Sequence, residues 1–372
     1  MAHPERVPEQ ELRGRLERVR AEMRRLEIDY LLVGPSTDLV YMIDYGVRQS
    51  ERLTLLVVPR EEPVRLVMPG FELPRVEGLA PLFEPVPWQD GEEPTETLAR
   101  VVANRGSGAT VAVGAQLFSH FLLRIQSVLG DATYVDGNRV LEPVRMRKSA
   151  WEVEKLRAAG EAADAVFDSL LQSDVEGRTE QELLARIHEL LLEKGHESIG
   201  GGIVGVGPNG ASPHHHVGDT RATRGSAVVV DFGGARDNYR SDITRTFHVG
   251  DPPQEFREVY RIVDEANQKA FEFARPGVRT SELDAVARKH IGDAGYGERF
   301  LHRLGHGIGL DGHEAPYLVD GSEVVVEEGM TFSIEPGIYL EGRFGVRIED
   351  IVAVTGDGAA RLNRATHELQ VV

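Results

Sequence analysis

The sequence predicts two domains: an α/β domain over residues 1–145 and an α+β domain over residues 146–372 that contains a pseudo-twofold repeat. Three observations support this prediction. The chain has 372 residues, which suits two domains of ordinary size. Before residue 145, short β-branched runs alternate with helical stretches. After it, two acidic strands flanked by glycines occur about a hundred residues apart.

The composition indicates a compact globular protein, with 41% hydrophobic and 27% charged residues. The formal charge of −18 makes nucleic acid and anionic membrane surfaces unfavourable partners. The amino terminus lacks the apolar core of a signal peptide and no stretch of 18 apolar residues occurs, so we expect a cytoplasmic location. Because the chain has no cysteine, a metal ion would need His, Asp and Glu ligands.

The first domain opens with a charged helical pattern at about residues 8–27. Strands are predicted at "YLLVG" from 30, "LTLLVVP" from 53, "VRLVMP" from 64 and "TVAVG" from 110. The second domain begins with a capping box, in which Ser149 stands three residues before Glu152. This pair predicts a helix that runs towards Gln172, and we place the domain boundary just before it.

Each half of the second domain has two predicted helices, the second of which begins near residue 176 or 276. Each half then has a strand flanked by glycines, "RGSAVVVDFGG" or "EGMTFSIEPG". A single copy is also what an ordinary buried strand before a turn looks like, but the matched pair is less easily explained in that way. We therefore expect one acid at a strand end in each half. The matching residues are Gly225, Asp231 and Gly233 in the first copy and Gly329, Glu335 and Gly337 in the second.

Two further strands carry acids: "SDITRTFHV" places Asp242 at the start of an alternating run, and "GVRIEDIVAV" places Glu349 in the middle of one. Because side chains alternate along a strand, Arg347 and Glu349 should share a face while Asp350 points the other way. A carboxylate buried there needs compensation. A salt bridge to Arg347 and a bound metal ion are the two alternatives.

Together with the first histidine of "GHGIGLDGHEAP", these acids form a donor set suited to Mn²⁺, Co²⁺ or Zn²⁺. Four carboxylates around one point would repel each other strongly without cations. Two ions bridged by carboxylates need that much negative charge, whereas one ion rarely does. The predicted ligands of this dinuclear centre are Asp231, Asp242, His306, Glu335 and Glu349.

The motifs "DFGG", "SDITRTF", "GHGIGLDGHEAP", "IEPGIY" and "GVRIED" resemble those of metallopeptidases of the methionine aminopeptidase, aminopeptidase P and prolidase type. The resemblance covers residues 150–372 and implies the pita-bread fold, and the α/β domain in front is similar to the creatinase-type N-terminal domain of the proline-specific branch. It implies that Asp231 chelates one ion, that Asp242 and Glu349 bridge both, and that His306 and Glu335 complete the second. A hydroxide between the ions would then attack the scissile carbonyl carbon.

The same resemblance assigns catalytic roles to two further histidines. His313 and His214 are expected to donate hydrogen bonds to the substrate or to the tetrahedral intermediate. His214 belongs to the run "PHHH", and we interpret its neighbours His215 and His216 as part of a polar turn.

Arginine and tyrosine side chains are expected to bind or orient the substrate. The resemblance implies that Arg347 and Tyr339 orient ligands and substrate around the metal ions. In the first domain, "YGVRQSERL" offers Arg48 and Arg52 in a loop, where a bidentate guanidinium would suit the free carboxylate of a dipeptide. A solvated charged turn is equally consistent with this stretch.

Two motifs are rejected on local grounds. "GVGPNG" at 205–210 fits the dinucleotide-binding pattern, but Pro208 and Pro213 prevent the required helix, so we predict a turn. His302 and His306 are four residues apart, yet Gly305 and Gly307 make a metalloprotease helix improbable.

The resemblance implies hydrolysis of Xaa-Pro bonds, which lack the amide N–H that most peptidases grip. We expect an Xaa-Pro dipeptidase (prolidase) acting on small peptides with proline in the second position. Aminopeptidase P, acting on longer peptides, is the alternative; a metal-free binding module or a creatinase-like hydrolase would require missing ligands. Two divalent ions per subunit, Mn²⁺ or Co²⁺ with Zn²⁺ as a further candidate, and a two-fold homodimer are expected.

Overall fold

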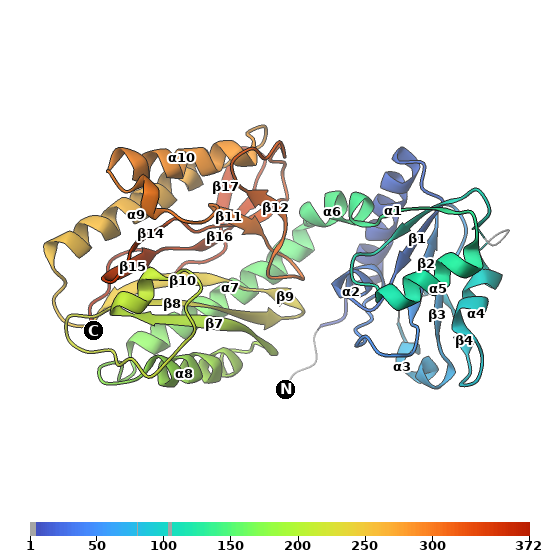
Figure 1. The fold of residues 1–372 in the computed structure, drawn as a ribbon, viewed down its shortest axis with the longest axis horizontal. Helices are drawn as coiled ribbons and strands as arrows, with labels where there is room; N and C mark the ends of the chain where they lie inside the picture. The colour runs from blue at the N-terminus through green and yellow to red at the C-terminus, as the bar shows by residue number, and fades with distance from the viewer. Residues whose placement is uncertain (1–4, 80, 103–105) are drawn as a thin grey trace. The chain divides into compact units, whose positions relative to one another are not determined.

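The computed structural model describes residues 5–79, 81–102 and 106–372. This part of the chain forms two compact units, Glu5–Arg145 and Met146–Val372 (Figure 1). Among the described residues, none of the helices combines the length and the apolar composition that a bilayer crossing requires.

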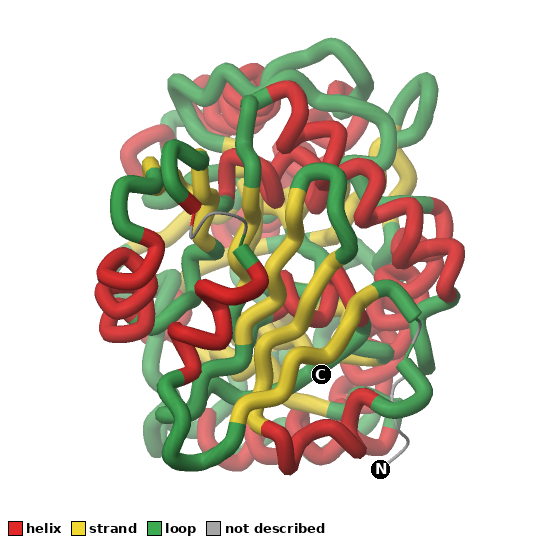
Figure 2. Tube along the Cα trace, turned by 90° about the vertical axis from the view of Figure 1, so that its right-hand side faces the viewer, coloured by secondary structure: helices red, strands yellow, loops and turns green. Residues whose placement is uncertain are grey.

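The first unit is built on a mixed six-stranded sheet with the order β4-β3-β2-β1-β5-β6. Strand β1 pairs antiparallel with β2 and parallel with β5. Every residue of β1 and β2 is buried, which requires that both faces of the sheet be covered. Helices accordingly lie on both sides of the strands (Figure 2). The strands predicted from 30, 53, 64 and 110 are confirmed as β1, β2, β3 and β5.

The helices of this unit are α1 (Glu9–Arg25), α2 (Thr37–Ile43), α3 (Leu73–Val76), α4 (Pro94–Val101), α5 (Ser119–Leu129) and α6 (Asn138–Met146), with the 3₁₀ turn η1 (Gly70–Glu72). Its strands are β1 (Tyr30–Val33), β2 (Leu55–Pro59), β3 (Val64–Pro69), β4 (Phe83–Trp88), β5 (Thr110–Val113) and β6 (Thr133–Asp136).

The second unit consists of two halves that each begin with two helices. The first half contains α7 (Ala150–Leu171), α8 (Glu180–Glu193), β7 (Ser198–Val206), η3 (Gly207–Ala211), β8 (Ala227–Arg236), β9 (Tyr239–Arg240) and β10 (Ile243–His248). The second half contains α9 (Gln254–Phe273), α10 (Thr280–Asp293), η4 (Gly297–Arg299), β11 (Gly305–Gly307), β12 (Glu314–Leu318), β13 (Thr331–Ile334), β14 (Gly337–Leu340), β15 (Phe344–Arg347), β16 (Asp350–Val354) and β17 (Ala359–Arg361).

Each half has its own sheet and its own core. Strands β10, β8 and β7 form the first sheet with β9 on β8, and β12-β11-β13-β16-β17 form the second. Helices α7 and α8 lie on one side of the strands and α9 and α10 on the other (Figure 1). The two halves meet where Thr244 pairs with Glu349 in an isolated bridge. The predicted capping box of Ser149 and Glu152 is confirmed at the start of α7, which ends at Leu171 with Gln172 as its C-cap.

The repeated acid and glycines mark the end of a strand in the second half but not in the first. Gly225 and Gly329 adopt the expected turn conformation, with φ of 95° and 85°. Asp231, however, lies inside β8, which continues to Arg236, so the expectation of an acid at the strand end is wrong in the first half. The glycine that follows it, Gly233, instead permits a close approach of two backbones, because a Cβ there would lie 2.0 Å from the carbonyl oxygen of Ser241.

The prediction that Glu349 lies in the middle of a strand is also wrong. The alternating run is divided into β15 and β16, and Glu349 lies between them. Strand β15 pairs with β14, whereas β16 pairs with β13, so the chain changes partners at this point. The bridge to Thr244 occupies the gap and brings Glu349 against the first half.

Candidate metal centre

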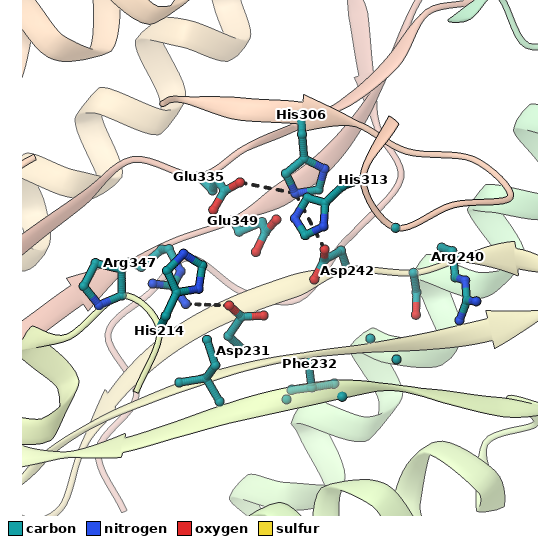
Figure 3. Close-up of a pocket in the computed structure, with 18 of the residues that line it drawn as sticks. His214, Asp231, Phe232, Arg240, Asp242, His306, His313, Glu335, Arg347 and Glu349 are labelled. Atoms are coloured by element: carbon teal, nitrogen blue, oxygen red, sulfur yellow. Dashed lines mark hydrogen bonds and ion pairs between the residues drawn. The ribbon is translucent and has the colours of Figure 1, made fainter. Parts of the chain in front are cut away.

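A cavity of about 770 Å³ lies between the strands of the two halves of the second unit. Figure 3 shows acidic and imidazole side chains converging on it from both halves. The five predicted ligands all line this cavity: Asp231, Asp242, His306, Glu335 and Glu349.

The donor atoms lie close together. One oxygen of Asp242, one oxygen of Glu349 and one ring nitrogen of His306 lie within 4.8 Å of one another. The Nε2 atom of His306 is 3.4 Å from Oε1 of Glu335 and 3.9 Å from Oδ2 of Asp242. Residues separated by about a hundred positions in the sequence therefore present donors to a common point.

The cavity is electrostatically incomplete without a cation. Burial, followed by repulsion from Asp231 and Glu335, raises the pKa of Asp242 well above its usual value. Burial also raises the pKa of Glu335 to about 7 and that of Glu349 well above its ordinary range. Among the described residues, these three acids make no ion pair with an arginine or lysine.

His306 is held in the form that a metal ligand requires. Burial lowers its pKa to about 3, so the ring is neutral at physiological pH. Its Nδ1 atom is 3.1 Å from the carbonyl oxygen of Gly307 and donates to it, which leaves the Nε2 lone pair facing the carboxylates. The residue is 2% exposed, because the flanking glycines allow other backbones to pack closely against β11.

Arg347 does not form a salt bridge with Glu349, so that alternative from the sequence is wrong. Its Nη2 atom donates to Oδ2 of Asp231 at 2.5 Å, and its Nε atom donates to the Thr244 hydroxyl at 3.1 Å. Arg347 and Glu349 share the cavity face as expected. The guanidinium nevertheless reaches across to Asp231 of β8.

Tyr339 and His302 extend the contacts of Arg347. The Nη1 atom of Arg347 donates to the Tyr339 hydroxyl at 2.8 Å, and that hydroxyl donates to Nε2 of His302 at 2.7 Å. Burial raises the pKa of Tyr339 to about 12 and lowers that of His302 to about 4, so the tyrosine keeps its proton and the histidine can accept it in a hydrogen bond. The sequence identified Tyr339 but considered His302 only as half of a rejected motif.

Thr244 contacts a predicted ligand, and the sequence reasoning missed it. Its hydroxyl donates to Oε2 of Glu349 at 2.6 Å and fixes that carboxylate. Ser333 acts similarly on Glu335, at 3.1 Å. Thr244 lies two residues after Asp242, so strand alternation could have placed both on one face. The pairing of Thr244 with Glu349 could not be predicted from the sequence, because the two residues lie about a hundred positions apart.

His214 and His313 both line the cavity and are exposed to it. The ring of His313 lies 3.8 Å from that of His306, centroid to centroid. Burial, followed by the charge of Arg303, lowers the pKa of His313. A neutral imidazole at the rim of the site can donate a hydrogen bond from one nitrogen.

Arg48 and Arg52 belong to the first unit, whereas the residues that line the cavity belong to the second. Arg52 contacts Asp90 at 3.2 Å and Glu51 at 2.6 Å, and Arg48 is exposed. Their binding of a substrate carboxylate stays a prediction.

The donor set fits divalent cations. Several buried carboxylates with raised pKa values and one neutral imidazole present hard and borderline donors to one space. The strain of this arrangement is relieved when positive charge enters it.

Comparisons with known proteins agree with this chemistry. Residues 154–356 match metallopeptidase family M24, and residues 15–147 match the Creatinase/Prolidase N-terminal domain. The Xaa-Pro dipeptidase of Lactobacillus delbrueckii is 35% identical, over 93% of this chain and 95% of the relative.

Two solved structures have the same architecture. Dipeptidase PepE from Mycobacterium ulcerans is 39% identical with a TM-score of 0.93, over 99% of this chain and 100% of that one. X-Pro aminopeptidase from Thermotoga maritima is 32% identical with a TM-score of 0.84, over 95% and 100%. With its acidic cavity and these similarities over nearly its whole length, the chain belongs to metallopeptidase family M24, whose pita-bread catalytic domain here follows a creatinase-type N-terminal domain.

Proposed function

We propose that this protein is an Xaa-Pro dipeptidase that uses two divalent ions, Mn²⁺ or Co²⁺ in preference to Zn²⁺. The observation that carries the proposal is the cluster of buried acids around a neutral His306. Among the described residues, no arginine or lysine forms an ion pair with Asp242, Glu335 or Glu349. Similarity to a protein named Xaa-Pro dipeptidase over 93% of this chain supports the choice of substrate. Asp231, Asp242, His306, Glu335 and Glu349 would hold the ions.

When bound, such ions lower the pKa of a water molecule and polarise a carbonyl group. The chain itself supplies orientation. Thr244 and Ser333 hold the carboxylates of Glu349 and Glu335 through their hydroxyl groups. Arg347 donates a hydrogen bond to Asp231, which also lines the cavity. These contacts preorganise the donors and lower the cost of binding.

We assign hydrogen-bond donation towards the substrate to His214 and His313. Both are exposed side chains that line the cavity. A donor held ready for the developing negative charge of a tetrahedral intermediate is typically worth about 3 to 4 kcal/mol. Tyr339 contributes by fixing Arg347 rather than by direct proton transfer, because its pKa of about 12 keeps it protonated.

The substrate length, the assembly and the location are further parts of the proposal. A dipeptidase must recognise a free carboxylate, and Arg48 and Arg52 are the side chains that we propose for this task. A homodimer with a two-fold interface is proposed as the functional assembly. The cytoplasmic location stays a prediction from the sequence.

The test is a comparison of Leu-Pro or Gly-Pro with an Xaa-Pro-Xaa tripeptide, across Mn²⁺, Co²⁺ and Zn²⁺. We expect faster hydrolysis of the dipeptides. Preference for the tripeptide would reject the dipeptidase and support an aminopeptidase P, which the similarity to the Thermotoga maritima enzyme favours as the second candidate. Substituting Arg48 or Arg52 by Ala should raise KM for the dipeptide more than KM for the tripeptide. The free carboxylate of the tripeptide is on its third residue and not on the proline.

A further inference from the structure

A buried carboxylate holds the base of the segment that carries His214. Glu180 is the first residue of α8 and is 0% exposed. Its Oε1 atom accepts hydrogen bonds from the backbone N–H of Val206 at 2.9 Å and from Nδ2 of Asn209 at 2.8 Å. Its Oε2 atom accepts from Nε2 of His215 and from the backbone N–H of Gly218, both at 2.8 Å.

These four donors fill the acceptor positions of an ionised carboxylate. Burial raises the pKa of Glu180, but the hydrogen bonds from His215, Val206 and Asn209 outweigh it and hold the pKa below its usual value. Two of the donors are backbone N–H groups and one is an amide, none of which can accept a proton in return. The ionised form of Glu180 is therefore favoured, and it binds the segment on both sides of His214.

The four attachments lie on both sides of His214 in the sequence. Val206 ends β7 and Asn209 lies in η3, whereas His215 follows His214 directly and Gly218 comes shortly after. Hydrogen bonds to a buried charge are about twice as strong as those between neutral groups. The backbone of His214 cannot move far without breaking one of them.

The same segment is also fixed against β15, the strand that carries Arg347. A Cβ on Gly345 would lie 1.9 Å from the carbonyl oxygen of Gly210, so only glycine permits this approach. The segment is thus attached to α8 through a charge and packed on β15 through its backbone.

The ring of His214 depends on these attachments. It lies in the cavity, on the side of Asp231 and Arg347 (Figure 3). No other described group forms a hydrogen bond with this ring, so its location is set by its own backbone. His215, which the sequence led us to interpret as part of a polar turn, is half-buried and holds Glu180, whereas His216 is exposed.

We propose that Glu180 and His215 form a positioning pair, which determines where His214 lies in the cavity and thereby how well it donates to the substrate. This inference rests on the function proposed for His214. Neither member of the pair touches the cavity itself, and both act through the intervening backbone.

The test compares Glu180→Gln and His215→Asn with two matched controls. Glu182→Gln removes the same charge from the same turn of α8, but Glu182 caps the helix through Thr179 and makes no hydrogen bond with the segment. His216→Asn changes the exposed neighbour of His215. If Glu180→Gln does not fold, His215→Asn carries the same comparison, because it removes one donor of four.

The first measurement does not use activity. In metal-loaded protein with ¹³C-labelled histidine, the His214 ring signal is assigned by its loss in His214→Asn. We expect this signal to shift or broaden in Glu180→Gln and in His215→Asn, and to stay in place in both controls. An unchanged signal in Glu180→Gln would overturn the inference.

The second measurement is kinetic. We expect kcat on Leu-Pro to fall about 10- to 100-fold in Glu180→Gln, with metal content unchanged. The double variant Glu180→Gln/His214→Asn should be no slower than His214→Asn alone, because both changes remove the same contribution. An equal further loss in the double variant would show that Glu180 acts elsewhere. Absence of wild-type activity on every Xaa-Pro peptide would reject the proposed function while leaving the ring-signal test decisive for the positioning.

Discussion

Glu349 and Asp350 are adjacent in the chain and equally buried, at 1% and 0% exposed, yet their surroundings are opposite. The pKa of Glu349 is raised well above its usual value, whereas that of Asp350 is held below it. Because successive side chains of an extended backbone point to opposite faces, each acid meets a different part of the molecule.

Asp350 lies among cationic side chains. Arg245 donates to it at 2.6 Å, Arg361 at 2.9 Å, and Nε2 of His367 is 2.6 Å away. Burial alone would raise the pKa of Asp350, but Arg245 and His367 outweigh it. The protein therefore compensates this charge by itself, and the group is structural.

Glu349 lies among other acids. Burial, followed by repulsion from Asp242 and Glu335, raises its pKa, and the Thr244 hydroxyl compensates only in part. A buried acid with its own cations thus stabilises the fold, whereas a buried acid without them indicates a site for an external cation.

The largest effect should come from loss of the proposed metal centre. Chelation, or Glu349→Gln, should lower kcat/KM on Leu-Pro by more than about 100-fold, beyond the 10- to 100-fold typical of residues that only support the ligands. Metal content measured on the same samples should fall in parallel, and Mn²⁺ or Co²⁺ should restore the chelated protein. Full activity of a metal-free sample would contradict the inference that Glu349 and its neighbouring acids form a cation site.

Asp350→Asn should mainly destabilise the fold. It leaves Arg245 buried without its partner, which costs about 3 to 5 kcal/mol. In the metal-free protein, Glu349→Gln should leave stability unchanged or higher, because it removes a repelled charge. Urea unfolding of both variants without metal measures this difference, and an equal loss of stability in the two would remove the distinction between the acids.

The pH dependence of stability should also distinguish the acids of the cavity from Asp350. The pKa of Glu335 is about 7 in the folded, metal-free protein against 4.5 when unfolded, so the folded state binds the extra proton between these values. Wild-type protein should therefore lose stability relative to Glu335→Gln as the pH rises from 4.5 to 7, by up to about 1.4 kcal/mol per pH unit. Asp350 has the opposite sign, since its stabilisation is lost only as the pH falls below 3.8 towards its lowered pKa. A pH-independent difference between wild type and Glu335→Gln would contradict the raised pKa.

The smallest effect should come from Thr244, whose hydroxyl supports Glu349. Thr244→Val should weaken Mn²⁺ binding about 10-fold, as is common for groups that orient ligands. Thr244→Ser keeps the hydroxyl and should bind Mn²⁺ as the wild type does. Titration calorimetry of the two variants separates the hydrogen bond from packing, and weakening in Thr244→Ser as large as that in Thr244→Val would contradict the role of the hydroxyl.

The local elements followed from local rules. The capping box of Ser149 and Glu152, the turn glycines Gly225 and Gly329 and the central strands of the first unit depend on residues close in sequence, so their patterns were sufficient. The errors concern contacts between distant segments. Gly233 marks a close backbone approach rather than a strand end, and Glu349 lies at a change of strand partner.

The partners of the site residues were also beyond local reasoning. Arg347 binds Asp231 rather than Glu349, Thr244 supports Glu349 across an isolated bridge, and His215 holds a carboxylate of α8. Each of these contacts joins residues at least 35 positions apart. Residue type identified the chemistry available, but pairing depends on the register and crossing of elements, which no short window contains.

By itself, the sequence determined the two-domain organisation, the repeated helix pairs and the set of acids and histidines, because periodicity and residue type are local properties of the chain. Only the tertiary structure decided which buried acids are neutralised from within and which are left to a cation. Asp350 faces Arg245, whereas Glu349 faces other carboxylates. These neighbours are brought together where strands from the two halves meet, so no local stretch of sequence contains them.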